Sequence, residues 1–120
     1  MLNRRETGAR GERIAVSFLK RKGYRVRETN FRCREGEIDI VAEKGGYLVF
    51  VEVRTKTDTS FGTPEESITT AKKDKLITLA QTYIDSHTGL PADWRIDVVA
   101  IELDKKGKVT RLHLIRNVTG

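Results

Sequence analysis

The sequence is poor in the residues from which many enzymes build their active sites. It has one cysteine, Cys33, and two histidines, His87 and His113, among 120 residues. A single cysteine excludes an intrachain disulfide and a cysteine-based metal site, which fits a reducing compartment. The histidines fall in different predicted elements without metal-ligand spacing, and there is no glycine loop followed by lysine and serine or threonine. Zinc chemistry and nucleotide hydrolysis are therefore not expected.

Long apolar runs are also missing. No run approaches the ~20 residues needed to span a bilayer, and the amino terminus lacks the apolar stretch of a signal peptide. We therefore expect a cytoplasmic protein with no membrane partner. A chain of 120 residues with 38% hydrophobic content fits a single domain over residues 1–120, with its core over about residues 8–116.

Basic residues are in excess. The formal net charge is +6, with 23 lysines and arginines against 17 aspartates and glutamates. A basic surface raises both the affinity and the encounter rate for phosphate backbones. The charge therefore favours a polyanionic partner such as nucleic acid.

Two neighbouring apolar segments each carry one acidic residue. Residues 36–41 contain Asp39, and residues 49–54 contain Glu52. Acids are rarely buried in strands unless something neutralises them. Two acids in adjacent strands therefore suggest a shared cation.

The turn between these segments predicts their register. Gly45-Gly46 is a two-residue hairpin signal, which places Lys44 opposite Tyr47. In the same register Asp39 faces Glu52, with Cβ atoms roughly 4.5 to 5.5 Å apart. Two like charges at that distance need a proton, a cationic side chain or a metal ion. Carboxylates and carbonyls suit Mg²⁺ or Mn²⁺.

One alternative to a metal pair stays open at this point, in which the two acids, Glu37 and Arg54 form a salt-bridge network that only stabilises the sheet. The register also stays open, because a four-residue loop would bring Asp39 to Glu52 only diagonally, which weakens the metal site without removing it. Arg54 and Lys56 share the parity of Glu52 and are expected on the same face of the strand.

Hydrophobic spacing and turn residues predict the element order αβββαββ. The expected elements are a helix over 9–22, strands over 24–28, 36–41 and 47–53, a helical region over 63–87, and strands over 94–103 and 109–115. Residues 29–35 are expected to form a polar loop. The helical region opens with a capping box and Pro64, and a break is expected near Thr70. A helix between two strands of one sheet favours a parallel crossover, so we expect a mixed central sheet flanked by helices.

A series of motifs in this order resembles the PD-(D/E)XK nuclease superfamily, which includes archaeal Holliday junction resolvases. The motifs are Gly8, Gly11-Glu12, Gly23-Tyr24, Asn30, Gly36-Glu37-Ile38-Asp39, Phe50-Val51-Glu52-Val53-Arg54, Phe61-Gly62, Lys72 and Arg95-Ile96-Asp97-Val98-Val99. Within that superfamily the chain is similar to the bacterial YraN family, whose members are inferred to be endonucleases. The resemblance covers about residues 8–101. It implies an α/β fold with a single restriction-endonuclease-like domain, and metal-dependent cleavage of DNA.

The resemblance implies roles for several residues around the hairpin. Asp39, Glu52 and the backbone carbonyl of Val53 would hold Mg²⁺ or Mn²⁺. Glu12 resembles the helix-borne acid that assists the metal site in this superfamily. The alternative for Glu12 is a first-turn glutamate that complements the helix dipole.

The motif lysine of the superfamily is replaced by Arg54. Arginine is always charged, so Arg54 can hold a phosphate or position a water but cannot act as a general base. Lys56 and Lys72 are candidates for the role of that lysine. The alternative for Lys72 is a chain that extends to solvent, and for Lys56 a solvated loop charge.

Basic and aromatic residues near the acids are candidates for contact with nucleic acid. They are Arg32, Arg34, Lys56, Phe61, Lys73 and Lys75. Such residues hold backbone phosphates and stack on exposed bases. A solvated helix face is the alternative for Lys73 and Lys75, and ordinary loops are the alternative for the others.

Three functions therefore stay open. The first is a metal-dependent DNA endonuclease, with branched or damaged DNA as candidate substrates. The second is a nucleic-acid-binding module that keeps the fold but cleaves poorly or not at all. The third is a protein-interaction domain that uses the edge of the last strand. Small resolvases cut paired strands as symmetric dimers, so the resemblance also allows a homodimer.

Overall fold

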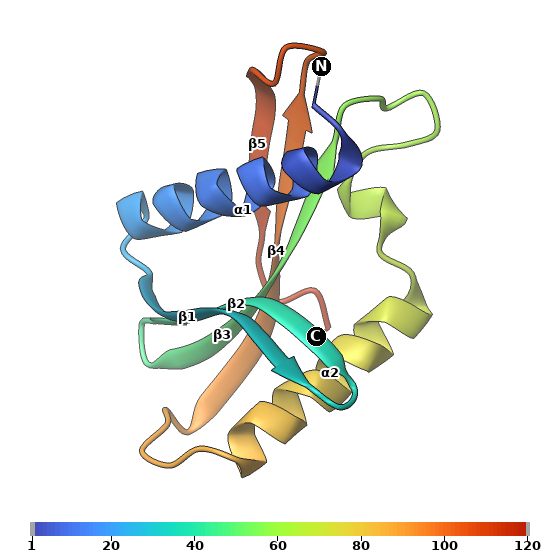
Figure 1. The fold of residues 1–120 in the computed structure, drawn as a ribbon. Helices are drawn as coiled ribbons and strands as arrows, with labels where there is room; N and C mark the ends of the chain where they lie inside the picture. The colour runs from blue at the N-terminus through green and yellow to red at the C-terminus, as the bar shows by residue number, and fades with distance from the viewer. Residues whose placement is uncertain (1, 120) are drawn as a thin grey trace.

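The computed structural model describes residues 2–119, which form a five-stranded sheet between two helices (Figure 1). The elements are α1 (Arg4–Arg21), β1 (Arg25–Cys33), β2 (Gly36–Lys44), β3 (Tyr47–Lys56), a 3-10 helix η1 (Glu65–Ser67), α2 (Thr70–Asp85), β4 (Asp93–Leu103) and β5 (Val109–Ile115). The predicted order αβββαββ is confirmed. No helix within residues 2–119 combines the length and the apolar character needed to cross a membrane.

The sheet is mixed, as predicted. Its strand order is β1-β2-β3-β4-β5, with β3 and β4 parallel and the other neighbours antiparallel. The parallel pair runs from Tyr47–Asp93 to Lys56–Glu102, and η1 and α2 form the crossover between its strands. β3 therefore lies at the centre of the sheet, with β1 and β5 at its edges.

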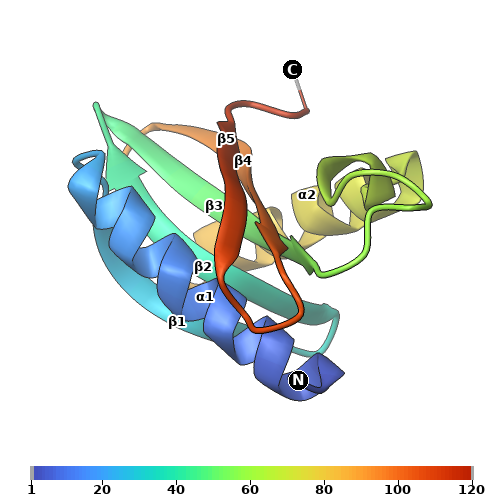
Figure 2. The same ribbon diagram turned by 90° about the horizontal axis from the view of Figure 1, so that it is seen from above.

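The two helices cover opposite faces of the sheet (Figure 2). On the α1 face, Ala15 and Leu19 pack with buried residues of the strands, which include Ile40, Val51 and Val99. On the α2 face, the buried residues include Phe50, Leu76, Leu79, Tyr83 and Ile96. Because both faces of β3 are covered, its sequence is almost continuously apolar.

The first strand is longer than the sequence suggested. The predicted polar loop over residues 29–35 is wrong, because β1 continues to Cys33 and pairs with β2 through Phe31–Ile38 and Cys33–Gly36. Phe31 and Cys33 pack against the core on the α2 face. The arginines between and beside them are exposed, and they hide this alternation in the sequence.

The first helix also begins earlier than predicted, at Arg4 instead of residue 9. Asn3 caps it, since its Oδ1 accepts a hydrogen bond of 2.8 Å from the backbone N–H of Glu6. The earlier start adds more than one turn, which carries Arg4, Arg5 and Thr7.

The predicted break in the second helical region is confirmed. Thr63 and Glu66 form the capping box, with bonds of 2.8 Å from Thr63 N–H to Glu66 Oε1 and 3.3 Å from Glu66 N–H to Thr63 Oγ1. This capping box lies at the start of the short η1 and not at the start of α2. α2 then starts after Thr69, whose Oγ1 accepts from the backbone N–H of Lys72 at 3.1 Å.

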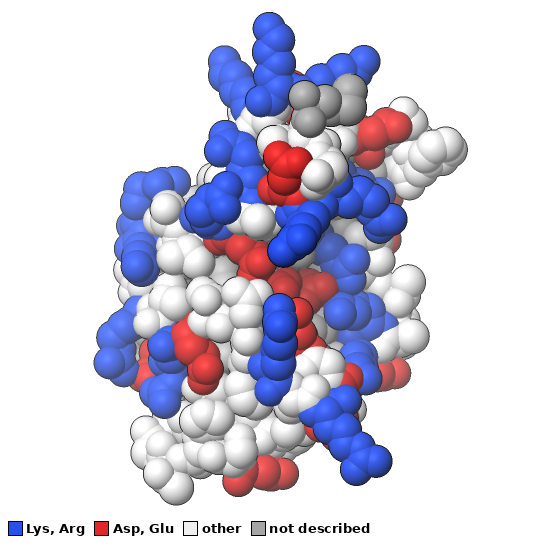
Figure 3. Space-filling model, in the orientation of Figure 1, with Lys and Arg blue, Asp and Glu red and all other residues white. Residues whose placement is uncertain are grey.

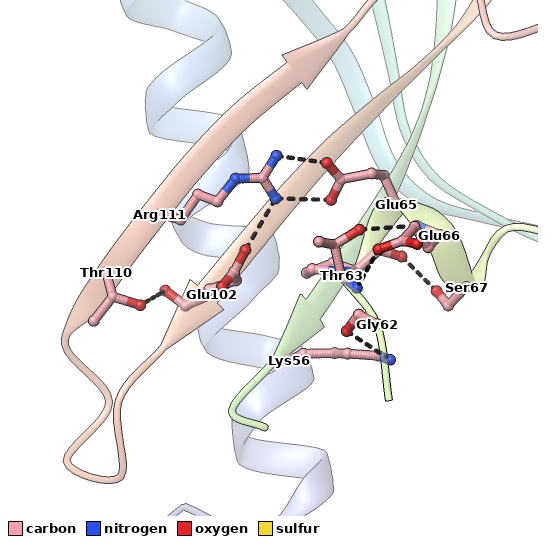
Figure 4. A network of polar contacts seen from close by, with 10 residues as sticks. Lys56, Gly62, Thr63, Glu65, Glu66, Ser67, Glu102, Thr110 and Arg111 are labelled. Atoms are coloured by element: carbon pink, nitrogen blue, oxygen red, sulfur yellow. Dashed lines mark hydrogen bonds and ion pairs between the residues drawn. The ribbon is translucent and has the colours of Figure 1, made fainter. Parts of the chain in front are cut away.

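A polar network ties η1 to β4 and β5 (Figure 4). Arg111 Nη1 donates to Glu65 Oε1 at 2.8 Å and to Glu102 Oε2 at 3.0 Å, and Arg111 Nη2 donates to Glu65 Oε2. Hydrogen bonding to Arg111 lowers the pKa of Glu65 to about 2. Lys56 Nζ lies 3.5 Å from the carbonyl of Gly62 across the loop before η1. The network holds the end of this loop beside the last strands.

Candidate active site

The β2–β3 hairpin has the predicted register, and its two strands separate at the acids. The ladder runs from Lys44–Tyr47 to Ile40–Val51 and ends one pair before Asp39 and Glu52. Past that point the backbone N–H of Val53 donates to Asp39 Oδ2 at 2.8 Å. The Asp39 side chain therefore takes the place of a β2 carbonyl where the strands diverge.

At the level of Asp39, the backbones of β1 and β2 twist so that the alternation of side chains between the two faces of the sheet is shifted by one residue. Ile40 packs on the α1 face and Ile38 on the α2 face, although residues two apart in a regular strand share a face. The pairs Thr29–Ile40 and Phe31–Ile38 leave Asn30 opposite Asp39. Asn30 has φ of 55°, a left-handed conformation that asparagine tolerates better than most residues. This shift places Asp39 at the boundary between the two faces of the sheet.

Glu12 reaches this boundary from α1. With its amide nitrogen turned towards the acids, Asn30 donates to Glu12 Oε1 at 2.9 Å and to Glu37 Oε1 at 2.6 Å. Burial and then the charge of Glu37 raise the pKa of Glu12, while the charge of Arg32 opposes them. Glu12 therefore lies beside Asp39, on the cavity that both residues line.

A close contact between backbone and side chain brings α1 to the site. A Cβ atom on Gly11 would lie 2.0 Å from Thr55 Oγ1 on β3, so the helix and strand approach closely only because this residue is glycine. Glu12 follows directly in the helix. Gly11 therefore sets the distance of Glu12 from β3.

The two central acids interact strongly. Burial and then the charge of Glu52 are the main causes that raise the pKa of Asp39 to about 7, while the hydrogen bond from Val53 opposes them. The nearby charge of Glu12 and a hydrogen bond with Glu52 also raise it. Glu52 is 5% exposed. Asp39 therefore takes up a proton near neutral pH in the metal-free protein.

Two basic side chains neutralise Glu52 from the α2 face. Arg54 Nη2 lies 3.0 Å and Lys72 Nζ 3.5 Å from Glu52 Oε2. Lys72 therefore points from α2 to the sheet and does not extend away into solvent. Within residues 2–119, Arg54 Nε is the one buried side-chain polar atom without a hydrogen-bond partner.

A cavity of about 580 Å³ opens onto Asp39. The first turns of α1 line one wall, and the end of β3 with the following loop lines the other. Its lining includes Glu12, Asp39, Val53, Arg54 and Lys56. In Figure 3, acidic side chains gather in the middle of this face, with lysines and arginines on either side.

Glu52 is not among the described residues that line this cavity, because it lies on the α2 face of β3 against Lys72. The two acids therefore do not share one open surface. Asp39 lines the cavity, and Glu52 lies behind it on the α2 side of the sheet.

The residues predicted to contact nucleic acid are distributed unevenly. Lys56 lines the cavity, and Phe61, on the loop that follows it, is 95% exposed. Arg32 and Arg34 are exposed near the β1–β2 turn, and Arg32 Nε lies 3.7 Å from Glu37 Oε1. These residues surround the acids on two sides.

The two lysines of α2 differ in position. Lys75 is exposed, and its Cε lies near Gly36 of β2. Lys73 is half-buried and lines a separate hollow of about 220 Å³ with Val98 and Val118. Lys73 therefore does not line the cavity that opens onto Asp39.

Three residues of the site had no role in the sequence interpretation. Arg4 and Thr7 line the cavity, and Asn30 bridges Glu12 and Glu37. The Asn3-x-x-Glu6 pattern is a signal for the earlier helix start that would have included Arg4 and Thr7. No local signal predicts the bridging role of Asn30, because its partners come from α1 and β2.

The model of the family described as uncharacterised protein family UPF0102 matches residues 11–101. The chain belongs to the UPF0102 family. This is the YraN family that the motifs predicted. The matched UPF0102 region contains Glu12, Asp39, Glu52 and Lys72.

Individual UPF0102 proteins are similar to this chain over nearly its whole length. One from Dehalococcoides mccartyi is 47% identical over 118 residues, which cover 98% of this chain and 96% of that protein. One from Caldicellulosiruptor saccharolyticus is 40% identical and covers 97% of this chain and 98% of its own length. One from Moorella thermoacetica is 43% identical and covers 96% of each. The similarity therefore spans both helices and all five strands.

Proposed function

We propose that this UPF0102 protein is a metal-dependent endonuclease that hydrolyses phosphodiester bonds in DNA. One observation carries the proposal: Asp39 opens into a cavity where β2 and β3 separate, with Glu52 directly behind it. Acids held this close in a buried place need a cation. The basic charge of the chain supports a phosphate-bearing substrate.

The residues present fit a hard divalent cation. Within residues 2–119 no group of three or more histidine, cysteine, aspartate or glutamate side chains is arranged to hold a metal. Mg²⁺ commonly uses only one or two carboxylates and keeps water and substrate phosphate as its other ligands. Asp39 and Glu52 would supply the carboxylates.

The Val53 carbonyl would be a third ligand. The N–H and C=O of one strand residue point to the same side, and the N–H of Val53 points to Asp39. The carbonyl therefore faces the same gap between β2 and β3. A bound divalent ion would favour the hydroxide form of a water molecule and neutralise charge on the phosphate.

The basic residues of the site are better suited to binding the phosphates of a substrate than to acting as a general base. Arg54 has a buried Nε–H without a partner in the described chain, which is a donor for a phosphate oxygen. Lys72 and Arg54 hold the Glu52 carboxylate, and a metal would compete with them for it. Lys56 lines the cavity, where it would contact the substrate backbone.

A second function is favoured by the same ion pairs. Because Arg54 and Lys72 already neutralise Glu52, the site does not require a metal for stability. A nucleic-acid-binding module that keeps this fold without cleavage is therefore the competing proposal.

A cleavage assay separates the two. Purified protein is incubated with linear, flapped and four-way-junction DNA, and with RNA, in Mg²⁺ or Mn²⁺. Asp39→Asn and Glu52→Gln should abolish cleavage, while the exposed control Asp74→Asn should cleave like the unaltered protein. Arg54→Lys restores the motif lysine and should keep or raise the rate.

Equal cleavage by the unaltered protein, Asp39→Asn and Glu52→Gln would contradict the assigned site and indicate a contaminating nuclease. Binding to DNA that weakens with salt, without cleavage of any substrate in either metal, would favour the binding module.

A further inference from the structure

Six basic residues form a ridge where the first turns of α1 meet the β4–β5 turn. They are Arg4, Arg5, Arg10, Lys105, Lys106 and Lys108. Residues 2–10 and 104–108 contain these six cations and two acids, a net charge of +4 against +6 for the whole chain. In Figure 3, lysines and arginines cover the end of the molecule where the amino terminus and the β4–β5 turn of Figure 1 meet. Most of the net charge is therefore concentrated at one end.

The backbone under this basic ridge is held in place. Arg10 Nε donates to the carbonyl of Gly107 at 2.6 Å, and Gly107 is buried against Leu2. The carboxylate of Asp104 accepts from the backbone N–H groups of Lys106 and Lys108 at 2.8 and 2.9 Å. The turn is thus shaped by its own acid and fastened to α1, while its lysine side chains stay exposed.

The cations of the ridge differ from several arginines elsewhere in the chain. Arg27, Arg95 and Arg111 each form an ion pair with an acid. None of the six ridge cations lies within 4.0 Å of a carboxylate in the part of the chain that the structure describes. Six like charges held together without carboxylate partners repel one another, and a polyanion would relieve that repulsion.

The ridge is continuous with the cavity of the proposed active site. Arg4 belongs to the ridge and also lines the cavity with Glu12 and Asp39. On the opposite wall, hydrogen bonds from Ser60 lower the pKa of Asp58, and the charges of Lys56 and Lys105 contribute to this. The β4–β5 turn therefore lies near the mouth of the cavity.

We propose that the basic ridge binds the phosphate backbone of a nucleic acid strand as it leaves the cavity, an inference that rests on the proposed function. Arg4 and Glu12 are eight residues apart in α1, about 12 Å along its axis. One strand of duplex DNA has a phosphate every ~3.4 Å of axis. The ridge contacts should therefore begin about three to four nucleotides from the phosphate at the acids.

Salt-dependent binding tests this inference. The ridge variant carries Lys105→Gln, Lys106→Gln and Lys108→Gln, and the control carries Lys20→Gln, Arg21→Gln and Lys22→Gln at the opposite end of α1. Both lose three exposed cations, so they have the same net charge. Each is combined with Asp39→Asn and measured on duplex DNA with a chelator, so that cleavage does not interfere.

The ridge variant should lower the slope of log affinity against log salt by about 0.9 for each lost phosphate contact, and by up to about 2.7. The control should change the slope by much less. Thermal denaturation checks that both variants are folded. In a further scan, single phosphates of the DNA are replaced by neutral methylphosphonates. Replacement at one group of phosphates should weaken binding by the protein with an intact ridge, and replacement of the same phosphates should have little effect on binding by the ridge variant.

The outcomes separate the ridge from the nuclease. Equal slopes for the ridge and control variants would overturn the inference that the ridge binds DNA, while metal-dependent cleavage by the unaltered protein would leave the proposed function standing. A slope that depends on the ridge, without cleavage, would support DNA binding by the ridge and overturn the proposal of an endonuclease. Binding of anionic lipid vesicles that depends on the ridge, with no salt-dependent binding of DNA, would overturn the inference in favour of a membrane surface.

Discussion

At the scale of single residues, the Asp39 carboxyl shows how the site costs stability. Its pKa is about 7 in the folded protein and about 3.8 as its ordinary value. Between these two values the folded state binds a proton that the unfolded state releases. The stability that this proton contributes is therefore full below about pH 4 and is lost as the pH rises towards 7.

Asp39→Asn should therefore stabilise the metal-free protein at high pH. The asparagine carbonyl can still accept from the N–H of Val53, and the repulsion from Glu52 is removed. We expect the melting temperature to rise by several degrees at about pH 8 and by clearly less at about pH 5, and the gain to vanish only below about pH 4, where Asp39 is protonated in both the folded and the unfolded state. Thermal denaturation with a chelator across this range measures the effect.

Asp74→Asn is the control for that measurement, because Asp74 is exposed on α2. It should give no gain that depends on pH. A gain of equal size for Asp39→Asn at both pH values would show that repulsion between Asp39 and Glu52 is not its source.

At the scale of elements, the contact between α1 and β3 decides whether Glu12 reaches the site. Gly8 and Gly11 lie in the same helix, but only Gly11 touches the strand. A Cβ on Gly8 would have no heavy atom within 4 Å, whereas one on Gly11 would overlap Thr55. Two glycines with similar helix propensity thus have different roles.

Gly11→Ala should destabilise the protein by about 1 to 3 kcal/mol through overpacking, and it should weaken cleavage by moving Glu12. Gly8→Ala should stabilise it by about 0.5 to 1 kcal/mol, because alanine is the better helix former. Urea unfolding of both variants measures the difference.

Thr55→Ala removes the hydroxyl that the new methyl group would meet. Combined with Gly11→Ala it should recover part of the lost stability, as expected for residues in direct contact. Equal stability of the two glycine variants would argue against the close approach of α1 to β3.

At the scale of the whole molecule, a buried acid joins segments that are far apart in the chain. Asp97 on β4 is fully buried and accepts from Tyr24 Oη at 2.9 Å, from Arg95 Nε at 3.1 Å and from the backbone N–H of Asn117 at 2.9 Å. Asp97 therefore joins β4 to the residue before β1 and to the segment after β5. The ion pair between Arg95 and Asp97 is a buried contact and not a surface one.

Asp97→Ala should cost about 3 to 5 kcal/mol, because it leaves the largely buried guanidinium of Arg95 without its carboxylate. Chemical denaturation measures this loss. Asp74→Ala removes an exposed aspartate and should stay within about 0.5 kcal/mol of the unaltered protein. A loss of similar size in both variants would mean that the buried network contributes little.

The predictions from sequence succeeded where local patterns carry the information. Gly45-Gly46 set the hairpin register, and the limits of β5 agree with the expected strand over 109–115. The end of β1 was missed because Phe31 and Cys33 are partly buried against the core under α2, and that helix lies far along the chain. The bridge from Asn30 to Glu12 and Glu37 was missed for the same reason.

The sequence by itself determined the order of elements, the hairpin with its two acids and the basic charge, since each depends on neighbouring residues or on composition. Only the tertiary structure decided that β2 and β3 separate at Asp39, that Glu52 faces Lys72, and that the basic ridge lies beside the cavity. These features depend on contacts between segments many residues apart. Because such contacts arise from packing of helices on the sheet, no local pattern specifies them.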